Sequence, residues 1–413
     1  MNERMTRDVF NSPSLLRLFV IVLLVFSGSV MSPAAESRTK EAAVPDQQQT
    51  DLTVFAGTYT TFGAPKGEGI YVYRMNAATG ALSLLHVAKD VPSPSYLAVD
   101  ASRRRLLCVN EVGKLDDVPG GGLSAFSLQQ PAAAPVFLNR QPSLGAAPCY
   151  VTIERTGRFA LVANYGQGSV AMFPIQADGR LGPASDSVQH EGSGKDPGRQ
   201  QGPHAHCIIT DPANRYALAA DLGIDAIVVY RMELEKGKLA RHREVKVKAG
   251  AGPRHLAFHP SGRWLYLIQE LNSTLTAFAW NADEGSPAEL QTISTLPDGY
   301  DGQSYCADVH VHPSGRFVYG SNRGHDSIAM FSIDEKTGKL TSLGHEPTGG
   351  RTPRNFALDP TGTWLLAANQ DSGNIVTFRI DERTGTLQQT EQVTTVPMPV
   401  CVKIVDLRES RGE

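Results

Sequence analysis

Four ionisable side chains of complementary chemistry stand at matching places in three successive units of a repeated phrase: His206, Arg254, Glu270 and Arg323. An imidazole of tunable pKa, a carboxylate and two guanidinium groups can together bind an anionic substrate and move a proton. A structural alternative stays open, in which the arginines and the glutamate form an ion pair and the histidine only packs beside it. Exposed ion pairs add little stability, so stability alone is a weak reason for such a cluster. We therefore predict that these four residues are catalytic.

Five further polar residues fill neighbouring positions of the repeat and are predicted to bind substrate: His204, His255, Glu111, Asp308 and Arg354. Two His-x-His pairs, His204 with His206 and His310 with His312, have a spacing compatible with a metal ion on one strand face. Neither pair is accompanied by a carboxylate-rich cluster, and His312 occupies the turn position of its repeat. We predict no metal site and no cofactor.

The phrase that carries these residues occurs seven times. It reads proline, one or two polar residues, a short apolar alternation, Asp/His-Pro-Ser/Thr-Gly and a second apolar run, most clearly at 253–264 and 353–364. The seven copies begin at positions 94, 148, 205, 253, 306, 353 and 399. Repeats of about 40–50 residues with several short strands are typical of β-propellers. The sequence therefore predicts an all-β fold, a seven-bladed β-propeller with four antiparallel strands per blade.

The two ends of the repeat array complement each other. Three strand-like segments precede the first copy, at 52–58, 69–75 and 82–88, and one lies in the last copy, at 400–405. Three strands and one make a blade of four, so we expect the closing blade to be shared by both chain ends. In a propeller the first strand of each repeat is innermost. The polar residues at these strand ends should therefore meet at one mouth of the central channel.

The N-terminal region has the layout of a secretory signal peptide. Basic residues at positions 4, 7 and 17 precede an uncharged apolar run at 18–26, which small residues follow. We expect cleavage after Ala34 and a periplasmic or secreted protein with no stable membrane anchor; an uncleaved signal anchor is the alternative. The expected segments are a signal peptide over 1–35, a disordered linker over 36–50, the propeller over 51–405 and a C-terminal tail over 406–413.

Charge and cysteine usage narrow the possible partners. A net charge of −3 gives no field that would attract nucleic acid, so we expect no nucleic-acid partner. Four of the five cysteines stand at or beside the start of the phrase in different repeats. Export would permit disulfides, but this placement favours buried thiols near the propeller axis. The oligomeric state does not follow from these patterns.

Five short motifs taken together resemble the seven-bladed lactonase family: Gly57–Thr60, Lys66–Tyr71, Pro203–His206, Gly252–His255 and Ser321–Ile328. That family includes propeller-type 6-phosphogluconolactonases and a fungal carboxy-muconate lactonizing enzyme, and the resemblance covers residues 51–405. In the muconate enzyme the proposed active site is a histidine, two arginines and a glutamate at the channel mouth. By motif and spacing these fall on the four predicted catalytic residues, which the repeat comparison isolates as well.

The resemblance implies a hydrolase that opens a sugar lactone without a metal. Arg254 and Arg323 would hold the anionic group of the substrate and the developing oxyanion, and either Glu270 or His206 would activate water. Two other functions stay open, a muconate-type cycloisomerase and a non-catalytic propeller that binds a partner. An export signal on a relative of enzymes of sugar phosphate metabolism also leaves open whether the lactone, a small-molecule substrate, is phosphorylated.

Overall fold

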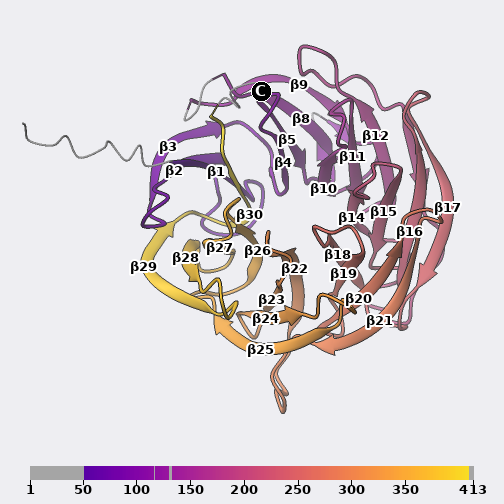
Figure 1. The fold of residues 1–413 in the computed structure, drawn as a ribbon. Helices are drawn as coiled ribbons and strands as arrows, with labels where there is room; N and C mark the ends of the chain where they lie inside the picture. Colours follow the sequence, from indigo (N-terminus) through magenta and orange to yellow (C-terminus); the bar gives the residue numbers. More distant parts are fainter. Residues whose placement is uncertain (1–50, 116, 130–132, 409–413) are drawn as a thin grey trace, which may run out of the picture. The chain divides into compact units, whose positions relative to one another are not determined.

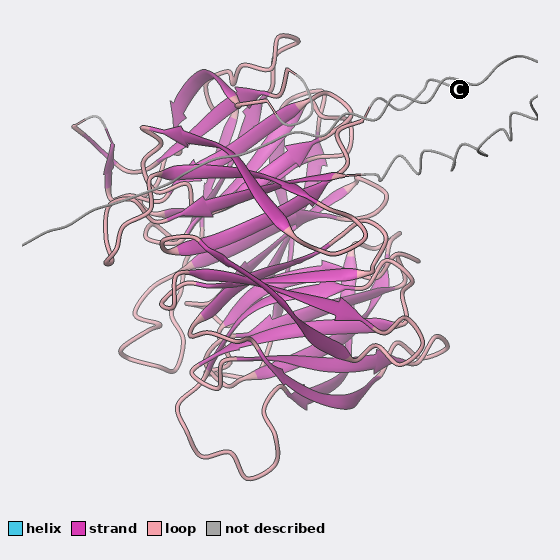
Figure 2. Cartoon of the chain, turned by 90° about the vertical axis from the view of Figure 1, so that its left-hand side faces the viewer, coloured by secondary structure: helices cyan, strands magenta, loops and turns pink. Residues whose placement is uncertain are grey.

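The computed structural model of the protein describes residues 51–115, 117–129 and 133–408. The predicted signal peptide and linker lie outside the described residues, as do the last five positions of the predicted tail. All regular elements in the described part are β-strands, and Figure 2 shows strands and loops only. No helix in that part is long and apolar enough to cross a membrane.

Seven four-stranded antiparallel sheets follow one another around a central axis (Figure 1). The closing blade contains β30 (Pro399–Val405), β1 (Leu52–Thr58), β2 (Gly69–Met75) and β3 (Leu82–Lys89). The second blade contains β4 (Leu97–Asp100), β5 (Arg105–Asn110), β8 (Gly122–Ser127) and β9 (Val136–Pro142). The third contains β10 (Pro148–Ile153), β11 (Phe159–Asn164), β12 (Ser169–Pro174) and β13 (Asp186–Gln189).

The remaining blades keep the same order from the axis outward. The fourth contains β14 (Ala205–Thr210), β15 (Tyr216–Asp221), β16 (Ala226–Glu233) and β17 (Lys238–Lys246). The fifth contains β18 (Pro253–Phe258), β19 (Trp264–Gln269), β20 (Thr274–Asn281) and β21 (Ser286–Ser294). The sixth contains β22 (Tyr305–Val311), β23 (Phe317–Arg323), β24 (Ser327–Ile333) and β25 (Leu340–Pro347). The seventh contains β26 (Pro353–Leu358), β27 (Trp364–Asn369), β28 (Asn374–Ile380) and β29 (Leu387–Thr395).

The predicted closing blade is confirmed. β1 pairs antiparallel with β30, from Thr53 opposite Val405 to Thr58 opposite Pro399. The innermost strands β4, β10, β14, β18, β22, β26 and β30 each contact their two neighbours, and β30 contacts β4, so the ring is complete. The sequence did not predict a small hairpin between β5 and β8, formed by β6 (Lys114–Leu115) and β7 (Val118–Pro119).

The repeated turn joins each blade to the next. Its glycine takes a positive φ, 70° at Gly262 and 75° at Gly315, which a residue with a Cβ adopts only with strain. In two copies a histidine begins the turn, and its Nε2 donates to the turn glycine of the following blade: His259 to Gly315 O and His312 to Gly362 O, both at 2.8 Å. His312 is therefore a structural residue of the turn rather than a metal ligand.

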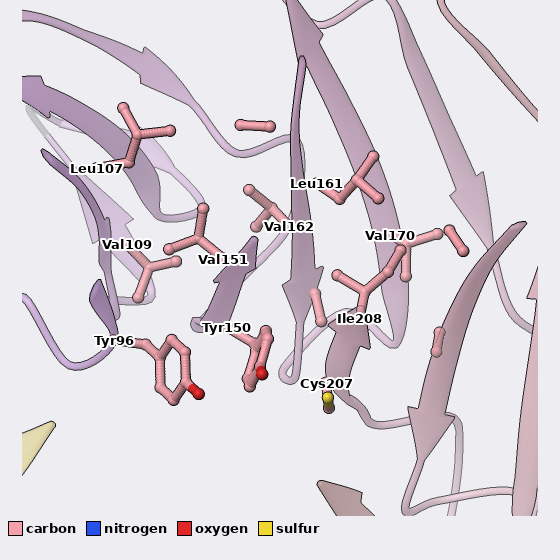
Figure 3. Packing of buried hydrophobic residues seen from close by; sticks show 14 of the residues in the cluster. Tyr96, Leu107, Val109, Tyr150, Val151, Leu161, Val162, Val170, Cys207 and Ile208 are labelled. Atoms are coloured by element: carbon pink, nitrogen blue, oxygen red, sulfur yellow. The ribbon is translucent and has the colours of Figure 1, made fainter. Parts of the chain in front are cut away.

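Apolar side chains fill the space between blades. Figure 3 shows residues of β5, β10, β11 and β14, among them Val109, Val151 and Val162, packed between neighbouring sheets. All five cysteines are buried and unpaired, as predicted. Small and β-branched residues dominate these faces because adjacent sheets approach closely in a propeller.

Candidate functional site

One mouth of the central channel holds a polar cavity with about 250 Å³ of empty space. Its walls come from the innermost strands β10, β14, β18, β26 and β30 and from the segments before β4 and after β5. The lining residues are Ser95, Tyr96, Glu111, Cys149, His206, Arg254, His255, Arg354, Asn355 and Val400. Five of the nine predicted site residues line this cavity, at the position that the repeat comparison indicated: Glu111, His206, Arg254, His255 and Arg354.

A cluster of three arginines around one glutamate adjoins this cavity through Arg254. Its other members, Glu270, Arg323 and Arg199, are not among the lining residues. Glu270 follows β19 and accepts hydrogen bonds from Arg254 Nε at 2.9 Å and from Arg199 Nη2 at 2.6 Å. Arg323 Nη2, at the end of β23, lies 2.9 Å from the same carboxylate. The structure thus brings three of the four predicted catalytic residues into direct contact. They occupy equivalent ends of first and second strands in adjacent blades, which explains why they meet.

The protonation state of this cluster follows from its charges. Burial alone would raise the pKa of Glu270, but the guanidinium groups of Arg323, Arg254 and Arg199 hold it well below its usual range. Burial, the largest influence on Arg323, lowers its pKa to about 10 even though Glu270 opposes the shift. With three guanidinium groups and one carboxylate the cluster carries a net positive charge. It can therefore attract an anionic or strongly polarised ligand.

His206, the second residue of β14, is buried and neutral. Burial lowers the pKa of His206 well below 6.5, and the nearby Arg254, His255 and Arg354 lower it further. Its Nδ1 is buried and has no hydrogen-bond partner among the described residues. The ring meets the edges of Tyr165 and His255, with centroids 5.5 and 5.1 Å apart. A neutral imidazole without a fixed partner, in the wall of a polar cavity, can accept a proton.

His255 and Asp308 form a hydrogen-bonded pair deeper in the channel. His255 Nδ1 lies 2.7 Å from Asp308 Oδ1, and both side chains are almost fully buried. His255 Nε2 lies 3.4 Å from Arg254 Nη1. Burial, followed by the charge of Arg254, lowers the pKa of His255 to about 4 in spite of the carboxylate beside it. His255 lines the cavity, whereas Asp308 lies behind it and is not among the lining residues.

Arg354 and Glu111 occupy the opposite wall of the cavity. Glu111 accepts hydrogen bonds from the Tyr59 hydroxyl at 3.2 and 3.1 Å. The Arg354 guanidinium lies over the Tyr59 ring, 5.4 Å from its centroid. Within the described part of the chain this guanidinium forms no hydrogen bond or ion pair, so its donors are available to a ligand. Tyr59 was not among the predicted site residues. It lies before the first copy of the repeated phrase, and its motif, Gly57–Thr60, supported only the family resemblance.

His204 does not line the cavity. Its ring stacks on Tyr165, with centroids 4.5 Å apart, and its Nδ1 lies 2.9 Å from the Tyr165 carbonyl oxygen. Arg199, by contrast, belongs to the arginine cluster although it stands in a loop between β13 and β14 with no equivalent in other repeats. In the described residues no group of three or more histidine, cysteine or acidic side chains is placed to hold a metal ion.

Comparison with known proteins decides the family. The profile described as Lactonase, 7-bladed beta-propeller, matches residues 53–404. The chain belongs to this seven-bladed β-propeller lactonase family. Among its members, the 6-phosphogluconolactonase of Bacillus subtilis (strain 168) is 37% identical over 351 residues, which cover 85% of this chain and 97% of the relative. The 6-phosphogluconolactonase of Formosa agariphila is 35% identical over 312 residues, 74% of this chain and 86% of the relative.

A solved structure gives the same result in three dimensions. The periplasmic gluconolactonase of Pseudomonas aeruginosa superposes with a TM-score of 0.81 at 33% sequence identity. The match covers 87% of this chain and 100% of the other. The resemblance recognised in the short motifs is therefore confirmed over the whole propeller of this lactonase-family chain.

Proposed function

We propose that the protein hydrolyses a sugar lactone of the gluconolactone type to the open hydroxy acid. The observation that carries this proposal is His206, a neutral buried imidazole with an unpartnered nitrogen, in a cavity wall shared with Arg254 and Arg354. Lactone opening needs one proton acceptor for water and cationic donors for the oxyanion. Membership of the lactonase family and the names of the related enzymes point to the same chemistry.

The proposed reaction has two steps. In the first, His206 accepts a proton from water while the water oxygen bonds to the lactone carbonyl carbon, and the carbonyl oxygen becomes an oxyanion. Arg254 stabilises this oxyanion with Nη2, since its other hydrogen bonds use Nε and Nη1. In the second, the oxyanion re-forms the carbonyl, the bond to the ring oxygen breaks, and protonated His206 returns the proton to that oxygen. Arg354 binds a hydroxyl or anionic substituent of the substrate.

Glu270 has a different role in this proposal. A carboxylate that accepts hydrogen bonds from Arg199 and Arg254 and faces Arg323 is a weak base, because protonation would leave three guanidinium groups without a counter-charge. We therefore propose that Glu270 orients the arginines, and that His206 is the general base. The two residues were left as alternatives by the sequence, and the geometry favours the imidazole.

The test is proton release during hydrolysis of gluconolactone and of its 6-phosphate by the wild-type protein and its variants. His206→Ala should lose at least a hundredfold in kcat, since a positioned general base contributes about 10²–10⁴. His242→Ala, which changes a half-buried histidine on the outermost strand β17, is the matched control and should behave as wild type. A wild-type rate no higher than the spontaneous rate on both lactones would refute the lactonase proposal. Full activity of His206→Ala would refute the assigned base but not the function.

We also propose that the protein acts in the periplasm or outside the cell. The predicted signal peptide supports this location, and so does the likeness to a periplasmic gluconolactonase. A periplasmic enzyme would meet unphosphorylated sugar lactones, so gluconolactone should be the better of the two substrates. N-terminal sequencing of exported protein should begin at Ala35; an intact N-terminus in the cytoplasmic fraction would contradict the proposed location.

A further inference from the structure

A buried carboxylate on the innermost strand β22 is held entirely by hydrogen-bond donors. Asp308 Oδ1 accepts from His255 Nδ1 at 2.7 Å and from the Val309 backbone N–H at 2.9 Å. Asp308 Oδ2 accepts from His310 Nε2 at 3.0 Å and from Asn355 Nδ2. No lysine or arginine of the described chain is paired with it. Burial would raise the pKa of Asp308, yet His310 and His255 hold it well below its usual range, so the carboxylate is ionised.

The pair dictates which nitrogen of His255 carries the proton. A carboxylate only accepts, so Nδ1 of neutral His255 must carry the hydrogen and Nε2 must carry a lone pair. That lone pair faces Arg254 Nη1 at 3.4 Å. The opposite tautomer would direct an N–H of His255 at an N–H of Arg254. Arg254 Nη1 also donates to the Ala307 carbonyl oxygen. Asp308 therefore determines, through His255, whether this nitrogen finds a second acceptor.

The fold itself does not require these charges. His255 and Asp308 occupy the same position of the repeat in successive blades. The equivalent residues in the other five blades are all uncharged: Tyr96, Tyr150, Cys207, Asn355 and Cys401. A buried ionised carboxylate costs solvation energy that a neutral side chain in this position avoids. The two titratable residues in this position, His255 and Asp308, lie next to Arg254. This placement points to a role in the candidate site rather than in holding the blades together.

We propose that Asp308 and His255 are positioning residues: Asp308 fixes the Nδ1–H tautomer of His255, and His255 Nε2 orients the Arg254 guanidinium toward the reacting carbonyl. This inference rests on the proposed function. It replaces the predicted substrate-binding role of these two residues, since Asp308 does not line the cavity and His255 acts through Arg254. A misplacement of a donor by about 1 Å can cost on the order of a hundredfold in rate.

The first test replaces the carboxylate. Asp308→Asn removes the negative charge and one of the two accepting oxygens, so the Nδ1–H tautomer of His255 loses its stabilisation and should switch to Nε2–H, and kcat should fall about 10-fold to 100-fold with KM changed little. The tautomer is read from imidazole ¹⁵N NMR, with the His255 signals identified by their loss in His255→Gln. The control is Asp211→Asn, a buried carboxylate whose partners are backbone N–H groups of a turn far from the cavity. Unchanged kcat in Asp308→Asn, or an Nε2–H tautomer in the wild type, would overturn the proposal.

The second test separates positioning from mere packing. The side-chain amide of glutamine reaches the place of Nε2, and that of asparagine reaches the place of Nδ1. His255→Gln can still offer an oxygen to Arg254, whereas His255→Asn can only satisfy Asp308. We expect His255→Gln to retain at least fivefold more kcat than His255→Asn. Equal rates, or a faster asparagine variant, would show that His255 serves only to satisfy Asp308.

The experiments distinguish a wrong lactonase proposal from a wrong positioning proposal. If the wild type hydrolyses neither gluconolactone nor its 6-phosphate, the lactonase proposal falls, and the positioning proposal is judged on the tautomer and on gluconate affinity measured calorimetrically. A switched tautomer with at least fivefold weaker gluconate binding in Asp308→Asn supports the positioning of Arg254. Unchanged affinity despite the switch overturns it.

Discussion

Replacing Glu270 with glutamine should destabilise the propeller more than any other single charge removal at this mouth. The carboxylate is buried and faces Arg199, Arg254 and Arg323 at 2.6 to 2.9 Å. Glutamine keeps the size of the side chain but removes the counter-charge and turns an NH₂ group toward a guanidinium. Leaving buried charges uncompensated typically costs about 3–5 kcal/mol.

That cost translates into a measurable melting shift. Unfolding entropy of about 2.1 cal/mol/K per residue, over the roughly 360 residues from Gln49 to Glu413, gives about 0.75 kcal/mol/K. A loss of 3–5 kcal/mol should therefore lower Tm by about 4–7 °C in differential scanning calorimetry. The matched control is Glu235→Gln, which breaks an exposed ion pair with Arg158 and should leave Tm nearly unchanged. Equal Tm values for the two variants would refute the idea that Glu270 compensates the arginines.

Three further predictions concern acidity, ring closure and the thiols. His255 takes up a proton near pH 6.5 in the unfolded chain but only near pH 4 in the folded protein. The free energy of unfolding should therefore fall by about 3 kcal/mol as the pH drops through this window. Denaturant unfolding at pH 7 and pH 4.5 checks this, and equal or greater stability at the lower pH contradicts it. Truncation after Pro397 removes β30 and should give insoluble or molten protein, whereas truncation after Leu407 should not; a cooperative calorimetric transition in the shorter chain would contradict the closing blade. Burial raises the pKa of Cys207 to about 12, and all five cysteines are buried. A colourimetric thiol reagent should therefore react with none of them in the native protein and with all five in denaturant. Rapid labelling of the native protein would disprove their burial.

The sequence was most informative where residues occupy equivalent positions of the repeat. His206, Arg254, Glu270 and Arg323 stand in such positions, so the period alone brings them to one mouth. Tyr59 lies before the first copy of the phrase, so no repeat position places it beside Glu111 and Arg354, although its motif, Gly57–Thr60, indicated the family.

Other parts of the site depend on distances that no pattern encodes. Arg199 lies in the loop between β13 and β14, outside the repeated phrase, so no repeat position predicts where its side chain lies. Its contact with Glu270 changes the chemistry, because a third guanidinium makes this carboxylate a poor base. His204 carried the same sequence signal as His206, yet a difference of two positions places it on Tyr165 outside the cavity. The hairpin β6–β7 has only two residues in each strand, which is too short for alternation to reveal.

The pairing of β1 with β30 has a consequence for biosynthesis. The innermost strand of the closing blade, β30, follows all the other strands of the propeller in the sequence, so β1 exposes an unpaired edge until β30 has been made. Pairing across nearly the full length of the chain is entropically slow compared with the local hairpins of the other blades. Six blades can therefore form during synthesis while the channel mouth still lacks a wall. Release of the chain before β30 would leave an open arc with an unpaired strand edge, and the site is complete only in protein that includes β30.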